Sequence, residues 1–154
     1  EINKGIGGER FFPALAESRD DFDPDYITVA YGTNDWNKTG EEDFKERCYA
    51  FYDALNRNYP NARIFAITPI WRKDHEKETA FGDFFKVKED IENIVGNFKN
   101  ITCIDGYDFI PQDENYFADL RLHPNDSGFD HYFRNLFRKI KAELNDTKSD
   151  SESL

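Results

Sequence analysis

Residues 26–31 read YITVAY, a short and nearly continuous run of apolar and β-branched side chains. A run of this length and composition predicts a strand that is buried on both faces of a sheet. Residues 63–68 (RIFAIT) and 101–104 (ITCI) have the same character and predict two further buried strands. Three such strands, well separated in the chain, indicate the interior of a parallel sheet.

The segment between the first two strands predicts a helix. Thr39 with Glu42 three residues later forms a capping-box pattern, and Pro60 marks the end of the helix. Phe44 and Tyr59 bound the apolar residues that recur between them at helical spacing. Further helices are predicted over residues 9–18, 84–98 and 127–144. Helices alternating with strands predict an α/β domain around a parallel sheet.

The chain of 154 residues has the length of one domain, which we place over residues 1–144. Residues 1–3 predict the end of a strand, and residues 145–154 (NDTKSDSESL) predict a disordered polar tail. A net charge of −11 disfavours binding to nucleic acids or anionic membranes, and no apolar run is long enough to cross a bilayer. The sequence leaves the cellular compartment open.

The cysteines and glycines give no sign of a metal or dinucleotide site. Cys48 falls on the apolar face of a predicted helix and Cys103 within a predicted strand, so both are expected to be buried free thiols. Neither GxGxxG nor a phosphate-binding loop is present. The sequence therefore gives no support to a dinucleotide cofactor.

Two glycine-bearing segments lie where functional loops of parallel sheets gather, at the carboxyl ends of strands. Gly32 allows a sharp turn after residues 26–31, and the Asn34 amide is then suited to donate to an oxyanion. An ordinary Gly-Asn-Asp turn is the alternative. Residues 3–8 (NKGIGG) form either a loop whose backbone N–H groups face an anion or a tight turn.

Residues 118–129 (ADLRLHPNDSGF) hold a candidate general base. His123 is followed by Pro124, which favours an extended histidine, and Asp126 is placed to cap the next helix. Asp119 lies four residues earlier and is a candidate to orient the imidazole ring. The alternative is a helix-capping loop in which His123 only makes local hydrogen bonds.

Taken together, these segments resemble the SGNH hydrolases, also called the GDSL esterase/lipase family. Gly8 resembles the oxyanion glycine, Gly32-Thr33-Asn34-Asp35 matches the GxND block, and His123 resembles the catalytic histidine. The resemblance implies a three-layer α/β/α fold with a flavodoxin-like parallel sheet. It also implies a serine esterase without metal or cofactor, in which Gly8 and Asn34 bind the oxyanion and His123 is the base.

The chain departs from the family pattern in two places. No Gly-Asp-Ser block is present, and in the family that block follows the first strand of the sheet. We therefore expect the first strand and its serine upstream of residue 1, or a second polypeptide that completes the sheet. The family's aspartate lies three residues before the histidine, where this chain has Leu120, so a one-residue bulge is needed to bring Asp119 to His123.

Three side chains are candidates for substrate binding: Trp36, Trp71 and Arg72. Aromatic rings at this edge of the sheet suit acylated carbohydrate, and packing within the loops is the alternative. Two other functions remain open. One is a non-catalytic SGNH-like binding module, and the other is a flavodoxin-like binding domain that would not bring Asn34 and His123 together.

Overall fold

The computed structural model describes residues 1–151, and side chains as far as residue 145. The chain divides into two compact units. The first, unit 1, comprises Glu1–Pro69 and Glu76–Asp105, and the second, unit 2, comprises Ile70–His75 and Gly106–Leu154. None of the helices within the described residues is long and apolar enough to cross a membrane.

Unit 1 contains a parallel sheet of three strands, β1 (Tyr26–Val29), β2 (Arg63–Ile67) and β3 (Ile101–Ile104), in the order β1-β2-β3. Tyr26 pairs with Arg63, and Ile64 pairs with Ile101. The three predicted strands and their parallel arrangement are confirmed, although β1 and β2 end earlier than predicted. Among the described residues β1 pairs only with β2, so it lies at one edge of the sheet.

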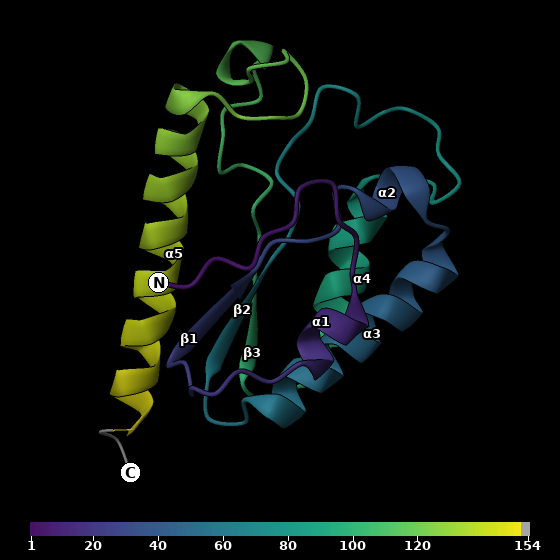
Figure 1. Ribbon diagram of the computed structural model, residues 1–154. Helices are drawn as coiled ribbons and strands as arrows, with labels where there is room; N and C mark the ends of the chain where they lie inside the picture. Colours follow the sequence, from purple (N-terminus) through teal and green to yellow (C-terminus); the bar gives the residue numbers. More distant parts are fainter. Residues whose placement is uncertain (152–154) are drawn as a thin grey trace. The chain divides into compact units, whose positions relative to one another are not determined.

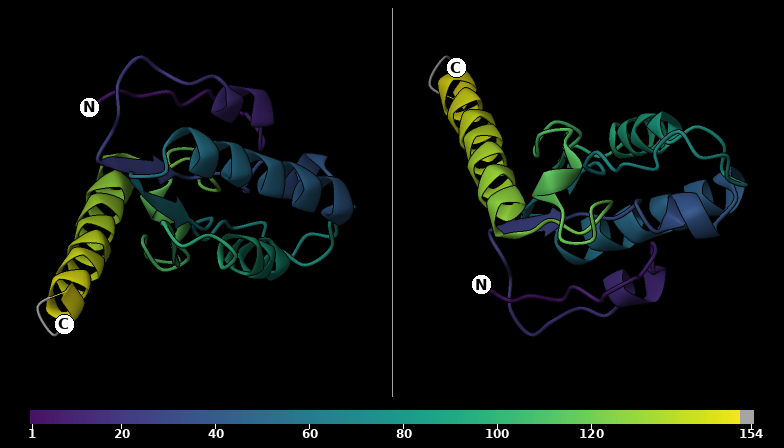
Figure 2. Two further views of the ribbon diagram at one scale, coloured as in Figure 1. Left: turned by 90° about the horizontal axis from the view of Figure 1, so that it is seen from below. Right: turned by 90° about the horizontal axis from the view of Figure 1, so that it is seen from above.

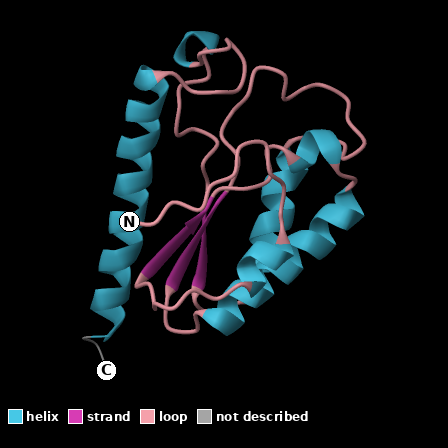
Figure 3. Cartoon of the chain, in the orientation of Figure 1, coloured by secondary structure: helices cyan, strands magenta, loops and turns pink. Residues whose placement is uncertain are grey.

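The helices of unit 1 cover one face of this sheet (Figures 1, 2 and 3). Helix α3 (Glu41–Asn58) connects β1 to β2, and α4 (Phe85–Val95) connects β2 to β3. Helix α1 (Pro13–Glu17) packs against α3. Unit 1 thus has two layers, and the third layer stays a prediction.

Aromatic rings fill much of the core of unit 1. The ring of Phe11 is fully buried and lies within 5.6 Å, centroid to centroid, of four other rings. These belong to Tyr31, Phe44, Phe51 and Tyr52. Phe11 thereby fixes the segment before α1 against the end of β1 and against α3.

Two predictions about unit 1 were wrong. Residues 1–3 are exposed and form no strand. Thr39 does not cap α3, whose N-cap is Gly40 without a side-chain hydrogen bond. Thr39 instead ends the short helix α2 (Asp35–Lys38), and its hydroxyl accepts a hydrogen bond from the Arg10 guanidinium at 3.2 Å. Because this bond spans 29 residues, the local capping pattern could not reveal it.

Unit 2 is built around Trp71, Ile110 and Phe117, with the 3₁₀ helix η1 (Glu114–Tyr116) and helix α5 (Asp126–Ser151). Asn125, not the predicted Asp126, caps α5, because its side-chain oxygen accepts the Gly128 N–H at 3.0 Å. A Cβ atom at Gly128 would lie 2.3 Å from the Tyr116 carbonyl oxygen.

Helix α5 also continues beyond its predicted end. It runs to Ser151, whereas the predicted helix ends at residue 144 and residues 145–154 were predicted to be a polar tail. Residues 152–154 lie outside the described part of the chain. Helix hydrogen bonds can extend into a polar segment once the helix has been nucleated.

Candidate active site

The turn after β1 brings Asn34 to the start of α2. Gly32 has φ +108°, a conformation that favours glycine, and a Cβ atom there would lie 2.8 Å from Cγ1 of Val87. The chain therefore turns tightly against α4, and Asn34 becomes the N-cap residue of α2. Glycine is needed at this position for both conformation and space.

Asn34 and Lys38 hold the glycine-bearing loop against α2. The Asn34 side-chain amide donates to the Glu9 carbonyl oxygen at 3.0 Å, and the Lys38 ammonium donates to the Gly8 carbonyl oxygen at 3.1 Å. Gly8 has φ +75°. The Asn34 amide carries two protons, so this bond orients the amide while its second proton can serve another acceptor. These two hydrogen bonds thus hold together the segments that carry the predicted oxyanion residues Asn34 and Gly8.

Asp35 forms a second link between the same segments. Its side chain is fully buried, and one carboxyl oxygen accepts the Phe11 N–H at 3.1 Å. Burial raises the pKa of the Asp35 carboxyl above its ordinary value, although the hydrogen bond from Phe11 opposes this. Asp35 therefore fixes, from within the core, the residue Phe11 that follows the glycine-bearing loop.

His123 and Asp119 lie on a closed loop of unit 2. Phe117 and Pro124 form an antiparallel bridge, and the Ala118 N–H donates to the His123 carbonyl oxygen at 2.7 Å. Within this loop Leu120 has φ +55°, a left-handed conformation that non-glycine residues rarely adopt. The turn at Leu120 provides the extra residue that separates Asp119 from the histidine.

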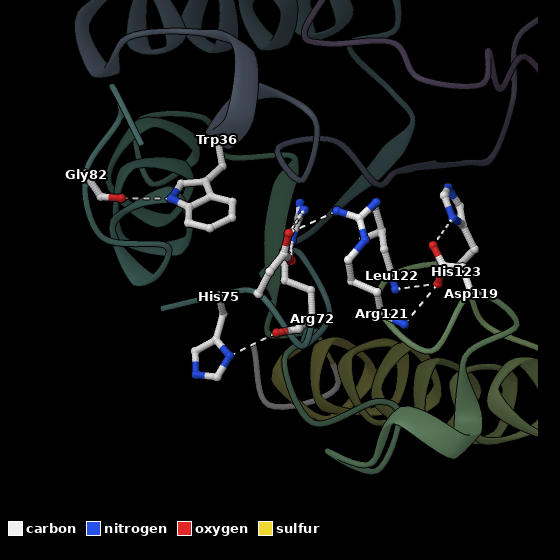
Figure 4. A network of polar contacts seen from close by, with 9 residues as sticks. Trp36, Arg72, His75, Gly82, Asp119, Arg121, Leu122 and His123 are labelled. Atoms are coloured by element: carbon white, nitrogen blue, oxygen red, sulfur yellow. Dashed lines mark hydrogen bonds and ion pairs between the residues drawn. The ribbon is translucent and has the colours of Figure 1, made fainter. Parts of the chain in front are cut away.

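The Asp119 carboxylate organises the loop and contacts the histidine ring (Figure 4). One oxygen accepts the backbone N–H groups of Arg121, Leu122 and His123 at 3.1, 2.8 and 3.0 Å. The other lies 2.8 Å from Nδ1 of His123. These hydrogen bonds, foremost that from Leu122, hold the pKa of Asp119 well below its ordinary value. Asp119 is therefore ionised near neutral pH.

The histidine ring is accessible. The His123 side chain is 73% exposed, whereas that of Asp119 is 33% exposed. With Nδ1–H donated to a carboxylate, Nε2 carries the lone pair that can accept a proton. The two predicted pairs, Gly8 with Asn34 and Asp119 with His123, each come together, and they belong to different units.

The predicted substrate-binding side chains are not exposed. Trp36 is fully buried, and its indole N–H donates to the Gly82 carbonyl oxygen at 2.8 Å. Trp71 is 8% exposed and packs on Phe117 with ring centroids 5.5 Å apart. The Arg72 guanidinium is fully buried against Asp74. Their burial favours the alternative of packing within the loops, and contact of Trp36, Trp71 and Arg72 with substrate stays a prediction.

Neither cysteine is part of the Gly8–Asn34 pair or of the Asp119–His123 pair. Cys48 is buried and Cys103 is half-buried, and both are free thiols. Burial raises the pKa of Cys103 to about 12 and that of Cys48 further still. Among the described residues, no group of three His, Cys, Asp or Glu side chains is arranged to hold a metal ion.

Sequence reasoning missed the residues that support these pairs. Lys38, four residues after Asn34, shows no distinguishing pattern, and Asp35 was noted only as the last residue of the GxND block. Asp74 forms an ion pair with Arg121, 47 residues later, and sequence spacing cannot reveal that contact. The HPN segment could have been interpreted as histidine followed by an N-cap, since asparagine is among the best helix caps.

Comparison with known proteins identifies a family. Residues 1–131 match the GDSL-like Lipase/Acylhydrolase family. No curated protein matches the chain. Among solved structures, one from Bacteroides ovatus described as a GDSL-like lipase matches with a TM-score of 0.73 and 23% identity, over 90% of this chain and 42% of that one.

Two carbohydrate esterases also share the fold. A family two enzyme from Clostridium thermocellum, solved with cellohexaose, matches with a TM-score of 0.63 and 19% identity, over 80% of this chain and 37% of that one. A family three enzyme from Talaromyces cellulolyticus matches with a TM-score of 0.59 and 18% identity, over 80% of this chain and 60% of that one. The chain thus spans less than two thirds of the length of each of these structures.

Proposed function

Because the chain belongs to the GDSL-like lipase/acylhydrolase family, we propose that it acts in a serine esterase that cleaves carboxylic esters. The observation that carries the proposal is the contact between Asp119 and Nδ1 of His123. This contact fixes the tautomer in which Nε2 can accept a proton, and an exposed ring can offer that nitrogen to a substrate.

The proposed reaction follows the serine hydrolase scheme. A serine hydroxyl attacks the ester carbonyl while Nε2 of His123 takes its proton, and the imidazolium then protonates the leaving alkoxide. Asp119 holds the ring and stabilises the imidazolium. Water, activated by the same histidine, then hydrolyses the acyl-enzyme.

Asn34 and Gly8 are proposed to bind the oxyanion. The Asn34 amide is already oriented by its bond to Glu9, and Lys38 and Asp35 fix the loop that carries Gly8. Donors held in advance stabilise developing negative charge without reorganising during the reaction. Removal of one such donor typically lowers the rate by a factor of ~10²–10³.

The nucleophile is proposed to lie upstream of residue 1. Five serines occur in the chain, and none stands in a Gly-Asp-Ser block; they are Ser18, Ser127, Ser149, Ser151 and Ser153. The family places that block before the glycine-bearing loop.

Acylated carbohydrate is the proposed substrate class. It is supported by the two carbohydrate esterases that share the fold. The buried positions of Trp36, Trp71 and Arg72 remove these three side chains as support. Comparing the release of acetate from acetylated oligosaccharides with the hydrolysis of long-chain aryl esters tests this part of the proposal.

Covalent labelling of the full-length protein tests the reaction itself. An aryl fluorophosphonate should modify one serine, and peptide mass spectrometry should locate it outside the five serines named above. The His123→Ala variant should be labelled far more slowly, while His131→Ala should be labelled at the parent rate. Absence of labelling in the parent protein would favour a non-catalytic binding module.

A further inference from the structure

An ion-paired bridge in unit 2 connects the segment after β2 with the loop that carries His123. The Arg72 guanidinium is fully buried and donates to both oxygens of Asp74, Nε to Oδ1 at 2.6 Å and Nη2 to Oδ2 at 3.0 Å. Buried arginines require such a partner, and the two-point geometry fixes the carboxylate in orientation as well as in position. Asp74 is thus a rigidly held anion.

Arg121 joins this anion to the histidine loop. Its Nη1 donates to Oδ2 of Asp74 at 3.0 Å. The backbone of Arg121 is bound to the same segment, because its carbonyl oxygen accepts the Lys73 N–H at 3.0 Å. Arg121 is therefore attached to residues 73 and 74 through both its side chain and its backbone.

The same residue also contacts the proposed orienting carboxylate. The Arg121 N–H donates to Oδ1 of Asp119, the oxygen that also accepts from Leu122 and His123. With Oδ1 committed to these three groups, Oδ2 faces Nδ1 of His123. Arg121 thus provides one of the three N–H groups that orient the Asp119 carboxylate (Figure 4).

The backbone between these residues needs external support. Leu120, immediately before Arg121, has φ +55°. Strained conformations of this kind persist only where the surroundings fix them. After Leu120, the contacts of Arg121 to Lys73 and Asp74 hold the backbone in place. Before it, the backbone is held by the hydrogen bond from the Leu120 N–H to the Phe117 carbonyl oxygen.

We propose that Asp74 and Arg121 are positioning residues for the His123–Asp119 pair, and that they act by holding Asp119 so that His123 keeps its proton on Nδ1. This inference rests on the proposed function, since positioning matters for catalysis only if His123 is the base. The Arg72 and Arg121 hydrogen bonds lower the pKa of Asp74, which keeps the bridge charged near neutral pH.

The test measures the tautomer of His123 directly. ¹⁵N chemical shifts of the imidazole ring, recorded at alkaline pH where the ring is neutral, give the ratio of the Nε2–H to the Nδ1–H form. In Asp74→Asn and in Arg121→Gln this ratio should rise about threefold to tenfold, the factor that corresponds to losing one hydrogen bond. Arg121→Lys keeps a cationic donor and should restore most of the parent ratio.

The matched control is Asp130→Asn. Asp130 forms an exposed ion pair with Arg134 on α5 at 2.8 Å, and its loss should leave the tautomer ratio unchanged. A direct electrostatic effect of these charges on the His123 tautomer can be distinguished from positioning. Asp74→Asn removes a negative charge and Arg121→Gln removes a positive one, so a direct effect would shift the tautomer ratio in opposite directions. Opposite shifts in these two variants would overturn the proposal, whereas equal shifts toward Nε2–H support it.

Arg121→Gln decides the question if Asp74→Asn does not fold. The Arg121 side chain is 47% exposed, and its removal leaves Asp74 paired with buried Arg72. An unchanged tautomer ratio in folded Arg121→Gln would overturn the proposal. The measurement needs no substrate, so its outcome is separate from that of the esterase proposal, which fails if the full-length protein neither hydrolyses esters nor reacts with a fluorophosphonate.

Discussion

The Nδ1 atom of His123 lies 2.8 Å from Oδ2 of Asp119, four residues earlier in the chain. A left-handed turn at Leu120 makes this contact possible, because it provides the extra residue between the aspartate and the histidine. A carboxylate at this position fixes the tautomer of the ring and stabilises the imidazolium. The proposed role of Asp119 leads to the first prediction.

Replacing Asp119 with asparagine should lower the kcat of the full-length protein for an aryl acetate. Asparagine preserves the shape of the side chain but removes its charge, and its amide can hold the ring in the wrong tautomer. The expected loss is about 10²- to 10⁴-fold, with KM little changed. Asp130→Asn, which removes an exposed carboxylate of the same unit, serves as the control. A parent-like kcat in Asp119→Asn would remove Asp119 from the mechanism.

Replacing Asn34 with alanine should also lower kcat. The loss of one oxyanion donor is expected to lower kcat by ~10²–10³ with a small change in KM. Asn97→Ala is a suitable control, because the Asn97 amide binds carbonyl groups at the end of α4 and has no proposed catalytic role. A change in KM alone would mean that Asn34 binds the substrate without stabilising the oxyanion.

The buried Asp35 predicts a pH dependence of stability. Burial raises the folded-state pKa above the unfolded value, so the folded state resists ionisation as pH rises. The contribution of Asp35 to stability is therefore fully present below about pH 4 and is lost as pH rises through the folded-state pKa. Urea unfolding should be measured from below pH 4 to above the folded-state pKa of Asp35. The free energy of unfolding of Asp35→Asn should rise relative to that of the parent as pH increases. A difference between the two proteins that does not vary with pH would contradict the assignment.

Gly128 predicts a local packing requirement. An added Cβ atom would lie 2.3 Å from the Tyr116 carbonyl oxygen, so Gly128→Ala should shift the start of α5 and lower the free energy of unfolding by about 1–3 kcal/mol. Gly7→Ala is the matched control, because a Cβ atom there has no neighbour within 4 Å. Equal stabilities of the two variants would show that the close approach is relieved without cost.

The sheet of unit 1 could be predicted from sequence because each strand is a continuous apolar run. Residues 101–104 were predicted with their observed bounds, since nearly every side chain there is apolar. The contact between Asp119 and His123 was also within reach, because both partners lie on one short loop. Local patterns are informative where the interacting residues are close in the chain.

Several contacts could not be predicted because the partner is distant in the chain. Trp36 was predicted to face substrate because it follows the GxND turn, whereas its indole N–H donates to the Gly82 carbonyl oxygen, 46 residues later. Thr39 resembled a helix cap, but its hydroxyl accepts a hydrogen bond from the Arg10 guanidinium. The bridge from Asp74 to Arg121 had no sequence signal, because charged residues are frequent throughout the chain.

The most direct test of the proposed function is the kcat/KM of the full-length His123→Ala variant for an aryl acetate. The chain contains two other histidines, His75 and His131, whose alanine variants provide matched controls. Loss of the general base should lower kcat/KM by at least about 10³-fold, while both controls stay near the parent value. A His123→Ala variant as active as the controls would contradict the assignment of His123 as the base.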